Sequence, residues 1–102
     1  MIKVEKAHEP TVATEVAYLP AVAVFKKDYD DEVRVSVVRD DAMLFFRVSD
    51  HRDRDTHEFF LEFEGKRVGD LNQMLEQVMG HDRRHARFNL IEQITPGDAW
   101  TR

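Results

Sequence analysis

Alternation of apolar and polar residues is the clearest pattern in this chain, and it runs from residue 32 to residue 64. Three stretches carry it: EVRVSVV at 32–38, AMLFFRVS at 42–49 and HEFFLEFE at 57–64. Successive side chains of a strand point to opposite faces of a sheet, and β-branched and aromatic residues favour strands. The pattern therefore predicts a central antiparallel meander over residues 32–64.

A helical period appears later in the chain, around residues 70–79. Apolar residues there recur at the spacing of one helix face, Asp70 can cap the start and Gly80 can end the helix. We expect one amphipathic helix, packed on one face of the sheet. Its apolar stripe consists of Leu71, Met74, Leu75, Val78 and Met79.

The remaining segments complete the predicted fold with less definite patterns. Residues 11–19 fit either a strand or a helix, and residues 21–27 (AVAVFKK) indicate a strand. Residues 86–95 alternate as a strand would, although a helix also fits them. The predicted fold class is α+β, with an antiparallel sheet of about five strands and one helix. The length of 102 residues is typical of a single domain, here 1–102.

Two adjacent aromatic pairs suggest how such a domain would act. In a strand, Phe45-Phe46 and Phe59-Phe60 must each place one ring on each face, whereas a single helix covers only one face. We expect a partner protein or a second copy in a homodimer to cover the other face. The predicted protein-binding residues are Met43, Phe45, Phe60, Glu62 and Trp100.

The charge is concentrated in the predicted meander. The chain has a net charge of −5, and residues 28–64 hold twelve acids against five Lys and Arg, a local charge of −7. Nucleic acid is not expected to bind directly, because a phosphate backbone requires a basic surface. A protein partner with a basic surface fits better. The absence of cysteine, of a signal-peptide pattern and of a long apolar run favours a cytoplasmic protein without membrane contact.

Two histidine-bearing stretches are candidates for metal or phosphate binding. In the loop from His51 to His57, His51, Asp53, Asp55 and His57 alternate, so an extended chain would point all four the same way. The connection from His81 to Arg87 spaces two histidines by four within a basic run. An ion-paired loop and a cationic helix end explain both stretches more simply, so we predict no metal and no cofactor.

No arrangement typical of a catalytic nucleophile, acid–base pair or phosphate loop occurs in the sequence. We therefore predict a small non-enzymatic protein-interaction module, such as a regulator, adaptor or inhibitor, which acts through an acidic, aromatic sheet surface. One alternative is a metal-, phosphate- or nucleic-acid-binding module that uses the two histidine stretches. Another is a structural subunit of a larger assembly.

Overall fold

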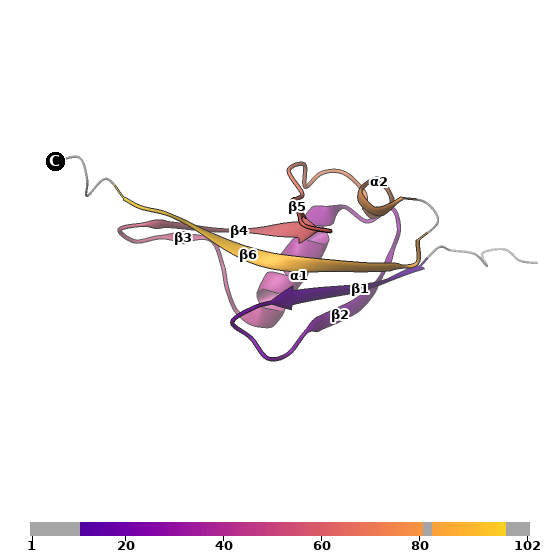
Figure 1. The fold of residues 1–102 in the computed structure, drawn as a ribbon, viewed down its shortest axis with the longest axis horizontal. Coiled ribbons are helices and arrows are strands. Elements are labelled where there is room, and N and C mark those ends of the chain that lie inside the picture. The colour runs from indigo at the N-terminus through magenta and orange to yellow at the C-terminus, as the bar shows by residue number, and fades with distance from the viewer. Residues whose placement is uncertain (1–10, 81–82, 98–102) are drawn as a thin grey trace, which may run out of the picture.

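The computed structural model describes residues 11–80 and 83–97, which form a mixed sheet with a helix across one face (Figure 1). The first half of the chain holds β1 (Thr11–Tyr18), β2 (Phe25–Asp30), α1 (Val35–Phe46) and β3 (His51–Arg52). The second half holds β4 (Thr56–Phe63), β5 (Lys66–Arg67), α2 (Leu75–Met79) and β6 (His85–Thr95).

The sheet follows the order β2-β1-β6-β4-β3, and β5 pairs with the other end of β4. The first strand, β1, lies parallel to the last, β6, with Ala13 opposite His85 and Tyr18 opposite Leu90. All the remaining strand pairs are antiparallel. The predicted α+β class with about five strands is confirmed, but the predictions of a purely antiparallel sheet and of a single helix are wrong.

The predicted meander over 32–64 is wrong in its first two strands, because residues 35–46 form the helix α1. Val35, Val38 and Ala42 are fully buried and lie on one face of the helix. Val35 also fits the alternation with Val33 and Val37 that suggested a strand. The helix ends at Arg47, which takes the left-handed conformation with φ 61°. The third predicted strand is confirmed as β4.

The two ambiguous segments are both strands. Residues 11–19 correspond to β1, and residues 86–95 correspond to β6. The strand expected over 21–27 begins later, at Phe25, and continues beyond Lys27 to Asp30. These corrections place the two ends of the described chain next to each other at the centre of the sheet.

The helix predicted over 70–79 is shorter than expected, since α2 covers only Leu75–Met79. The preceding residues instead form backbone hydrogen bonds with the segment before α1: Val35 N–H donates to Gln73 O, and Leu75 N–H donates to Val33 O. Because the residues before Leu75 use their backbone groups in these bonds, the helix begins only at Leu75. Within the described ranges, neither helix has the length and apolar character needed to cross a membrane.

The core lies between α1 and one face of the sheet. Alternate residues of β1, β4 and β6 point toward the helix, so their side chains are buried while their neighbours face the other way. The fully buried members are Val12, Val16, Val35, Val38, Ala42, Leu61, Leu75 and Phe88.

A tight two-residue turn joins β4 to β5. Phe63 pairs with Lys66, and Glu64 and Gly65 between them have φ values of 53° and 83°. Two consecutive positive φ values are typical of a type I′ hairpin, which favours glycine at the second position.

Beyond the end of β1, the sheet continues as a narrow projection (Figure 1). We call this projection the arm and define it as residues 51–58 together with residues 91–95. Thr56 pairs with Thr95 there, and β3 adds two residues on the outer side of β4. The tip is the loop Asp53–Asp55, so this stretch is not extended throughout, as four aligned ligand side chains would require.

Candidate functional site

The structure separates the residues predicted to share one binding face. Met43 lies in the core with 7% of its surface exposed, and Phe45 lies on the exposed side of α1. Phe60 and Glu62 occupy the face of the sheet opposite the helix, which we call the open face. Trp100 lies outside the described residues. The prediction that these residues share one surface is wrong, because the stretch with Met43 and Phe45 is helical.

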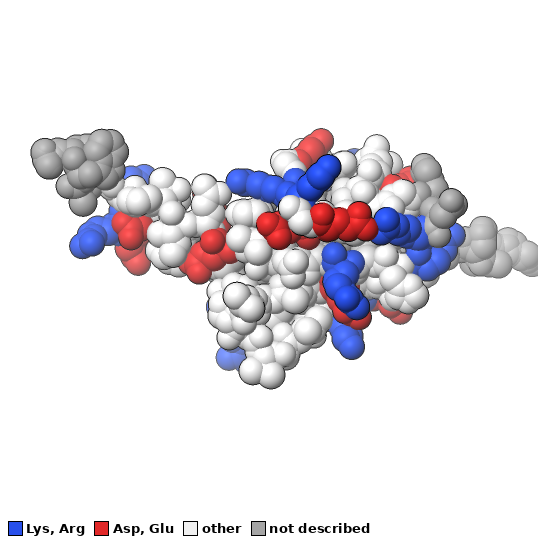
Figure 2. Space-filling model, viewed as in Figure 1, with Lys and Arg blue, Asp and Glu red and all other residues white. Residues whose placement is uncertain are grey.

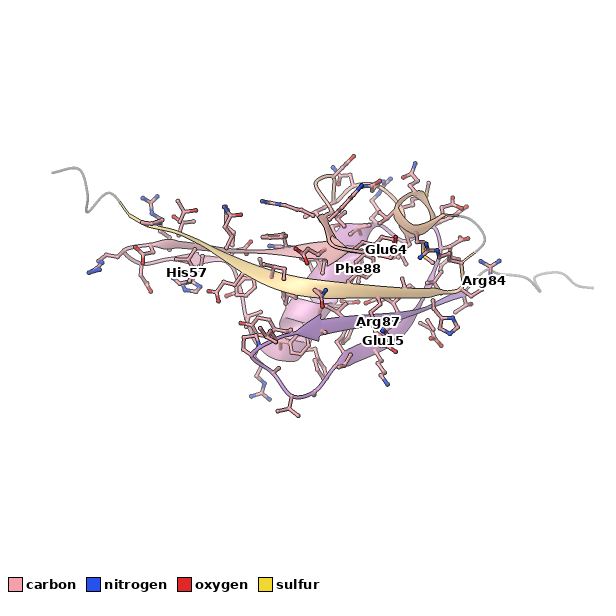
Figure 3. The ribbon with its side chains drawn as sticks, viewed as in Figure 1. Glu15, His57, Glu64, Arg84, Arg87 and Phe88 are labelled. Carbon is pink, nitrogen blue, oxygen red and sulfur yellow. The ribbon has the colours of Figure 1, made fainter. Side chains whose placement is uncertain are left out.

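The open face is lined by charged and polar side chains of both signs (Figure 2). Glu15 of β1 and Arg87 of β6 lie next to each other, with 3.5 Å between Oε1 and Nε (Figure 3). The guanidinium of Arg67 lies 4.2 Å from the ring centroid of Phe60 and donates a hydrogen bond to Gln93. The aromatic ring on this face is therefore already covered from within the chain.

Exposed apolar side chains gather at one end of the molecule, which we call the apolar end. They come from the loop between β1 and β2 and from the last turns of α1. Figure 2 shows this lower bulge as an area with very little charge. Its members are Leu19 and Val22, which are almost fully exposed, together with Val24, Leu44 and Phe45.

A shallow groove of about 270 Å³ runs between β2 and α1 beside the apolar end. The rings of Phe25 and Phe45 form one end of it, with centroids 5.4 Å apart. Lys27 and Asp41 form the other end as an ion pair of 3.3 Å, and Leu44 completes the lining. The groove thus combines apolar walls with one paired cation and anion.

A hydrogen bond from Tyr29 holds the carboxylate of this groove in place. The hydroxyl of Tyr29 donates to Asp41 over 2.7 Å, and Lys27 lies over the same ring. Burial of the ring, and then this hydrogen bond to an acidic acceptor, raise the pKa of Tyr29 well above its ordinary value. The phenol therefore remains a donor throughout the neutral range.

The strand along this groove is an edge of the sheet. β2 pairs with β1 on one side, and within the described residues no strand pairs with it on the other. An edge strand presents backbone N–H and C=O groups that can pair with another chain. Its side chains alternate, so that Phe25, Lys27 and Tyr29 face α1.

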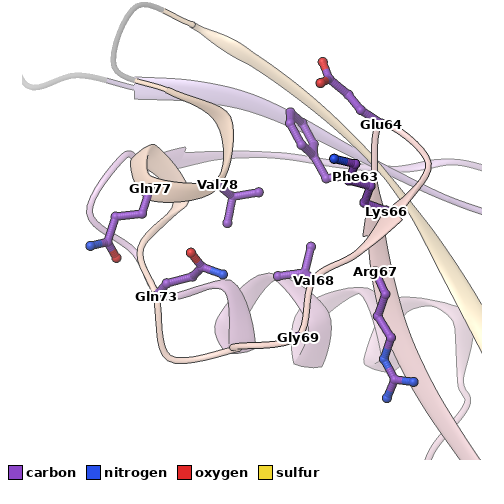
Figure 4. A pocket seen from close by; sticks show the side chains of 9 residues that line it. All are labelled: Phe63, Glu64, Lys66, Arg67, Val68, Gly69, Gln73, Gln77 and Val78. Atoms are coloured by element: carbon purple, nitrogen blue, oxygen red, sulfur yellow. The ribbon is translucent and has the colours of Figure 1, made fainter.

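A second hollow, of about 400 Å³, lies between the β4–β5 turn and α2 (Figure 4). Lys66, Gln73 and Gln77 line much of it, with Val68 and Val78 deeper between them. Its volume would suit a small ligand. Glu64 at its rim pairs with Arg83 over 2.7 Å, and Lys66 and Arg67 are its cationic lining residues.

The two candidate stretches for metal or phosphate binding form only part of the arrangements considered for them. His51 and His57 face each other across β3 and β4, but Asp53 and Asp55 lie in the loop between these strands. Within residues 11–80 and 83–97, no three His, Cys, Asp or Glu side chains converge as metal ligands. His85 begins a strand and does not lie on a helix, so the spacing of four does not place it on a helix face; His81 lies outside the described residues.

Sequence reasoning identified Phe45 but missed the other members of the groove and the apolar end. Leu19, Val22 and Val24 appeared to belong to strands, although Pro20 among them is a signal for a loop. Leu44 and Phe45 are adjacent, so only a helix could expose both side chains on one side. The alternating pattern had concealed that helix.

The fold resembles that of known ubiquitin-like domains. A structure described as molecular mimicry of SUMO that promotes DNA repair superimposes with a TM-score of 0.59 and 14% identity, over 82% of this chain and 94% of that one. The ubiquitin-like domain of an Arabidopsis thaliana protein, determined by solution NMR, gives a TM-score of 0.57 and 12% identity, over 87% and 86%. A second structure of that domain, based on evolutionary couplings and sparse NMR data, gives 0.56 and 13%, over 82% and 88%.

No protein-family model matches the sequence, and no curated protein does. At 12–14% identity the likeness concerns the fold alone. The chain is thus similar in architecture to ubiquitin-like domains, with a small mixed sheet curled around a helix.

Proposed function

We propose that this chain is a small non-enzymatic protein-interaction module which binds an extended segment of a partner protein along β2. One observation carries the proposal: exposed apolar side chains from two separate parts of the chain gather beside an edge strand. Isolated exposed apolar residues are ordinary, whereas a group of them next to a groove is typical of a binding surface. The ubiquitin-like architecture of the similar structures is compatible with such a role.

The backbone of β2 supplies the first part of the recognition. An extended peptide can add a strand to the exposed edge of a sheet, so that main-chain hydrogen bonds provide affinity and alternate side chains provide specificity. With six residues from Phe25 to Asp30, β2 offers enough length for a short peptide strand. The peptide would lie between β2 and the exposed side of α1.

The groove supplies the second part. Every other side chain of an added strand would point toward α1, where Leu44 is 78% exposed and Phe45 is 48% exposed. A large apolar residue of the partner would contact these side chains and the edge of Phe25. Covering Leu44 and Phe45 would remove apolar surface from water, which is the main favourable term in association.

Local charge indicates which residues would flank that apolar side chain. Lys26 lies next to Phe25 on β2 and is exposed, while Lys27 beside it already pairs with Asp41. Acidic residues in the partner would therefore be favoured beside the apolar position. This differs from the basic partner expected from the net charge, because recognition depends on the residues at the groove and not on the chain average.

The open face is the weaker candidate for the same role. Arg67 already covers Phe60, and Glu62 lies opposite Arg67 and Asn89 in the register of the strands. Binding there would displace contacts that the chain makes with itself, whereas Leu44 at the groove has most of its surface free. We therefore place the interaction at Phe45 rather than at Phe60.

Selection from a random peptide library on the purified protein would test this function. We expect selected peptides to be extended, with a large apolar residue next to Asp or Glu, and to shift the amide resonances of β2 and α1. Phe45→Ser should weaken their binding by about tenfold or more, as truncation of a central interface residue does. Higher salt should weaken it further.

A matched control comes from the arm. Ile94 is 52% exposed, close to the exposure of Phe45, but it lies far along β6. Ile94→Ser should leave peptide binding unchanged. Peptides that shift the open face instead, or that bind Phe45→Ser as well as the original chain, would refute a site between β2 and α1.

A further inference from the structure

The hollow between the β4–β5 turn and α2 lies toward the opposite edge of the sheet from the groove beside β2 (Figure 4). It has no part in the proposed function. Its lining combines apolar walls, side-chain amides and a positive charge. We propose that this hollow binds a small carboxylic acid with a compact apolar body.

Three apolar side chains form the walls of the hollow. Phe63 of β4 and Val68 are 9% and 6% exposed, and Val78 of α2 is partly buried against the same core. Figure 4 shows Val68 and Val78 pointing into the space between the turn and α2. Such walls remove an apolar body from water but offer it no hydrogen bond. A short branched alkyl chain would therefore fit this part of the hollow.

The register of the β4–β5 hairpin directs a cation to the same side. Lys66 is directly opposite Phe63, and opposed residues of an antiparallel pair point to the same face of the sheet. Phe63 is buried on the face that the helices cover, so Lys66 also points to that face. Arg67, the next residue, points to the open face and covers Phe60. Lys66 is exposed, and among the described residues no acidic side chain pairs with its ammonium.

The charges around the hollow favour an anion. Glu64 at the rim pairs with Arg83 over 2.7 Å, so the negative charge of the lining is already balanced. The ammonium of Lys66 is not balanced in this way by any described residue. A carboxylate beside it would form an ion pair with a charge-assisted hydrogen bond, whereas a cation would be repelled.

The side-chain amide of Gln73 offers a directional contact. Figure 4 shows this amide turned toward Val68 and Val78, and the residue is half-buried. Among the described residues, no hydrogen bond involves the Gln73 side chain, whereas Oε1 of Gln77 accepts from Met74 N–H. A half-buried polar group without an internal partner can bond to a ligand. The N–H₂ group of Gln73 can donate to a ligand oxygen.

The volume limits the size of the ligand. The hollow measures about 400 Å³, near the lower end of the range of roughly 300–1,000 Å³ for ligand pockets. It suits an acid with a few carbon atoms and is too small for a long-chain lipid. Isocaproate is a suitable probe, because its branched end matches the valine walls and its carboxylate matches Lys66.

Titration of the full chain with sodium isocaproate would test the site, followed by ¹H–¹³C spectra of the valine methyl groups and ¹H–¹⁵N spectra of the side-chain amides. We expect Val68, Val78 and Gln73 to shift together and to saturate at the same concentration. Isocaproamide has the same apolar body without the charge, and should bind about tenfold or more weakly. Acetate, which lacks the body, should not shift the valine methyl groups.

A charge-removing variant tests the role assigned to the ammonium. Lys66→Met keeps a long side chain and should weaken isocaproate binding by about tenfold or more, but isocaproamide binding far less. Arg52→Met is the matched control, because it removes an exposed cation from the arm. It should leave isocaproate binding unchanged.

Several results would overturn the proposal. One is that Val68 and Val78 do not shift in a large excess of isocaproate. Others are equal affinities for the acid and the amide, and an unchanged affinity for the acid in Lys66→Met. Shifts confined to Leu44 would place the acid in the groove beside β2 and would equally refute a site at the hollow.

Discussion

At the scale of single residues, the backbone N–H and C=O of Phe59, on the outer edge of β4, bond to side chains instead of to a neighbouring strand. Nε of Arg39 donates to Phe59 O over 2.7 Å, and Phe59 N–H donates to Asp50 Oδ1 over 2.9 Å. Arg39 and Asp50 also bind each other, at 2.6 Å. The pair thus covers the stretch of edge between β3 and β5.

Asp50→Ala should therefore destabilise the fold. It leaves the N–H of the buried Phe59 without its acceptor and Arg39 without its main anion. We expect a loss of about 1–3 kcal/mol in the free energy of unfolding, measured by urea denaturation. Asp40→Ala is the control: its exposed carboxylate also contacts Arg39, and its loss should change stability by less than about 0.5 kcal/mol.

Tyr29 gives the molecule a defined response to alkali. Its pKa is raised in the folded state, so the unfolded chain loses the phenolic proton at a lower pH than the folded chain does. The stability that this group contributes is complete below the ordinary tyrosine pKa of about 10 and is lost as pH rises above it.

We expect the free energy of unfolding to fall as pH rises above about 10, and to fall less steeply in Tyr29→Phe. Urea denaturation at several pH values, performed side by side on the two proteins, measures the difference. The comparison cancels the contribution of Tyr18, whose pKa is also raised, by burial and by Glu92. Equal slopes in both proteins would contradict the assigned role of Tyr29.

At the scale of elements, the sequence predicted those strands whose pattern had a single explanation. In β4, apolar residues alternate along a segment that helical spacing fits poorly, and that strand was found. Residues 86–95 fitted a strand and a helix, so the pattern alone left β6 open. In α1, Val35, Val38 and Ala42 fit the helix, while Val33, Val35 and Val37 fit a strand. Short apolar runs of this kind satisfy both periods, and only packing against the sheet decides between them.

The segments that precede α1 and α2 pair with each other, and no local sequence pattern predicts this pairing. Residues 31–36 and 71–76 are far apart in sequence, yet they exchange several backbone hydrogen bonds, and Arg34 forms a bridge with Met74. Leu75 is fully buried there, whereas Val78, one turn later, is half-buried.

Leu75→Ala should cost about 2–5 kcal/mol, because it leaves a cavity where the two segments meet. Val78→Ala should cost clearly less, since its side chain is partly in water at the hollow of Figure 4. Thermal unfolding of the two variants and of the original chain measures which variant loses more stability. A larger loss for Val78→Ala would show that this junction is not part of the core.

The candidate site was predictable only in part for a related reason. Phe45 was selected because two adjacent rings cannot both face one side of a strand, and the structure leaves 48% of its surface exposed. The reason was wrong, because both rings lie on a helix. The groove depends on the approach of β2 to α1, which is a tertiary contact that single-sequence patterns do not contain.

At the scale of the whole molecule, the homodimer expected from the sequence stays a prediction. Its interface would now lie elsewhere on the surface. The open face is charged and its aromatic ring is covered, so self-association would use the apolar end and the edge of β2. Two copies of β2 could pair antiparallel across a twofold axis.

Light scattering over a dilution series would measure this association. If the dimer forms, we expect the mass to fall from twice the chain mass toward the chain mass on dilution, and Phe45→Ser to move that transition to higher concentration. Ile94→Ser should leave it unchanged. A monomer at all concentrations would mean that the apolar end is free to receive a partner segment.

The central position of β6 also matters while the chain is being made. The strands on either side of it, β1 and β4, have no direct contact with each other in the sheet, so neither can complete its pairing until β6 is present. At roughly 5–20 residues per second, a ribosome needs several seconds to proceed from β1 to the end of β6. During that interval one backbone edge of β1 stays unpaired, and an unpaired edge of this kind can pair with other chains.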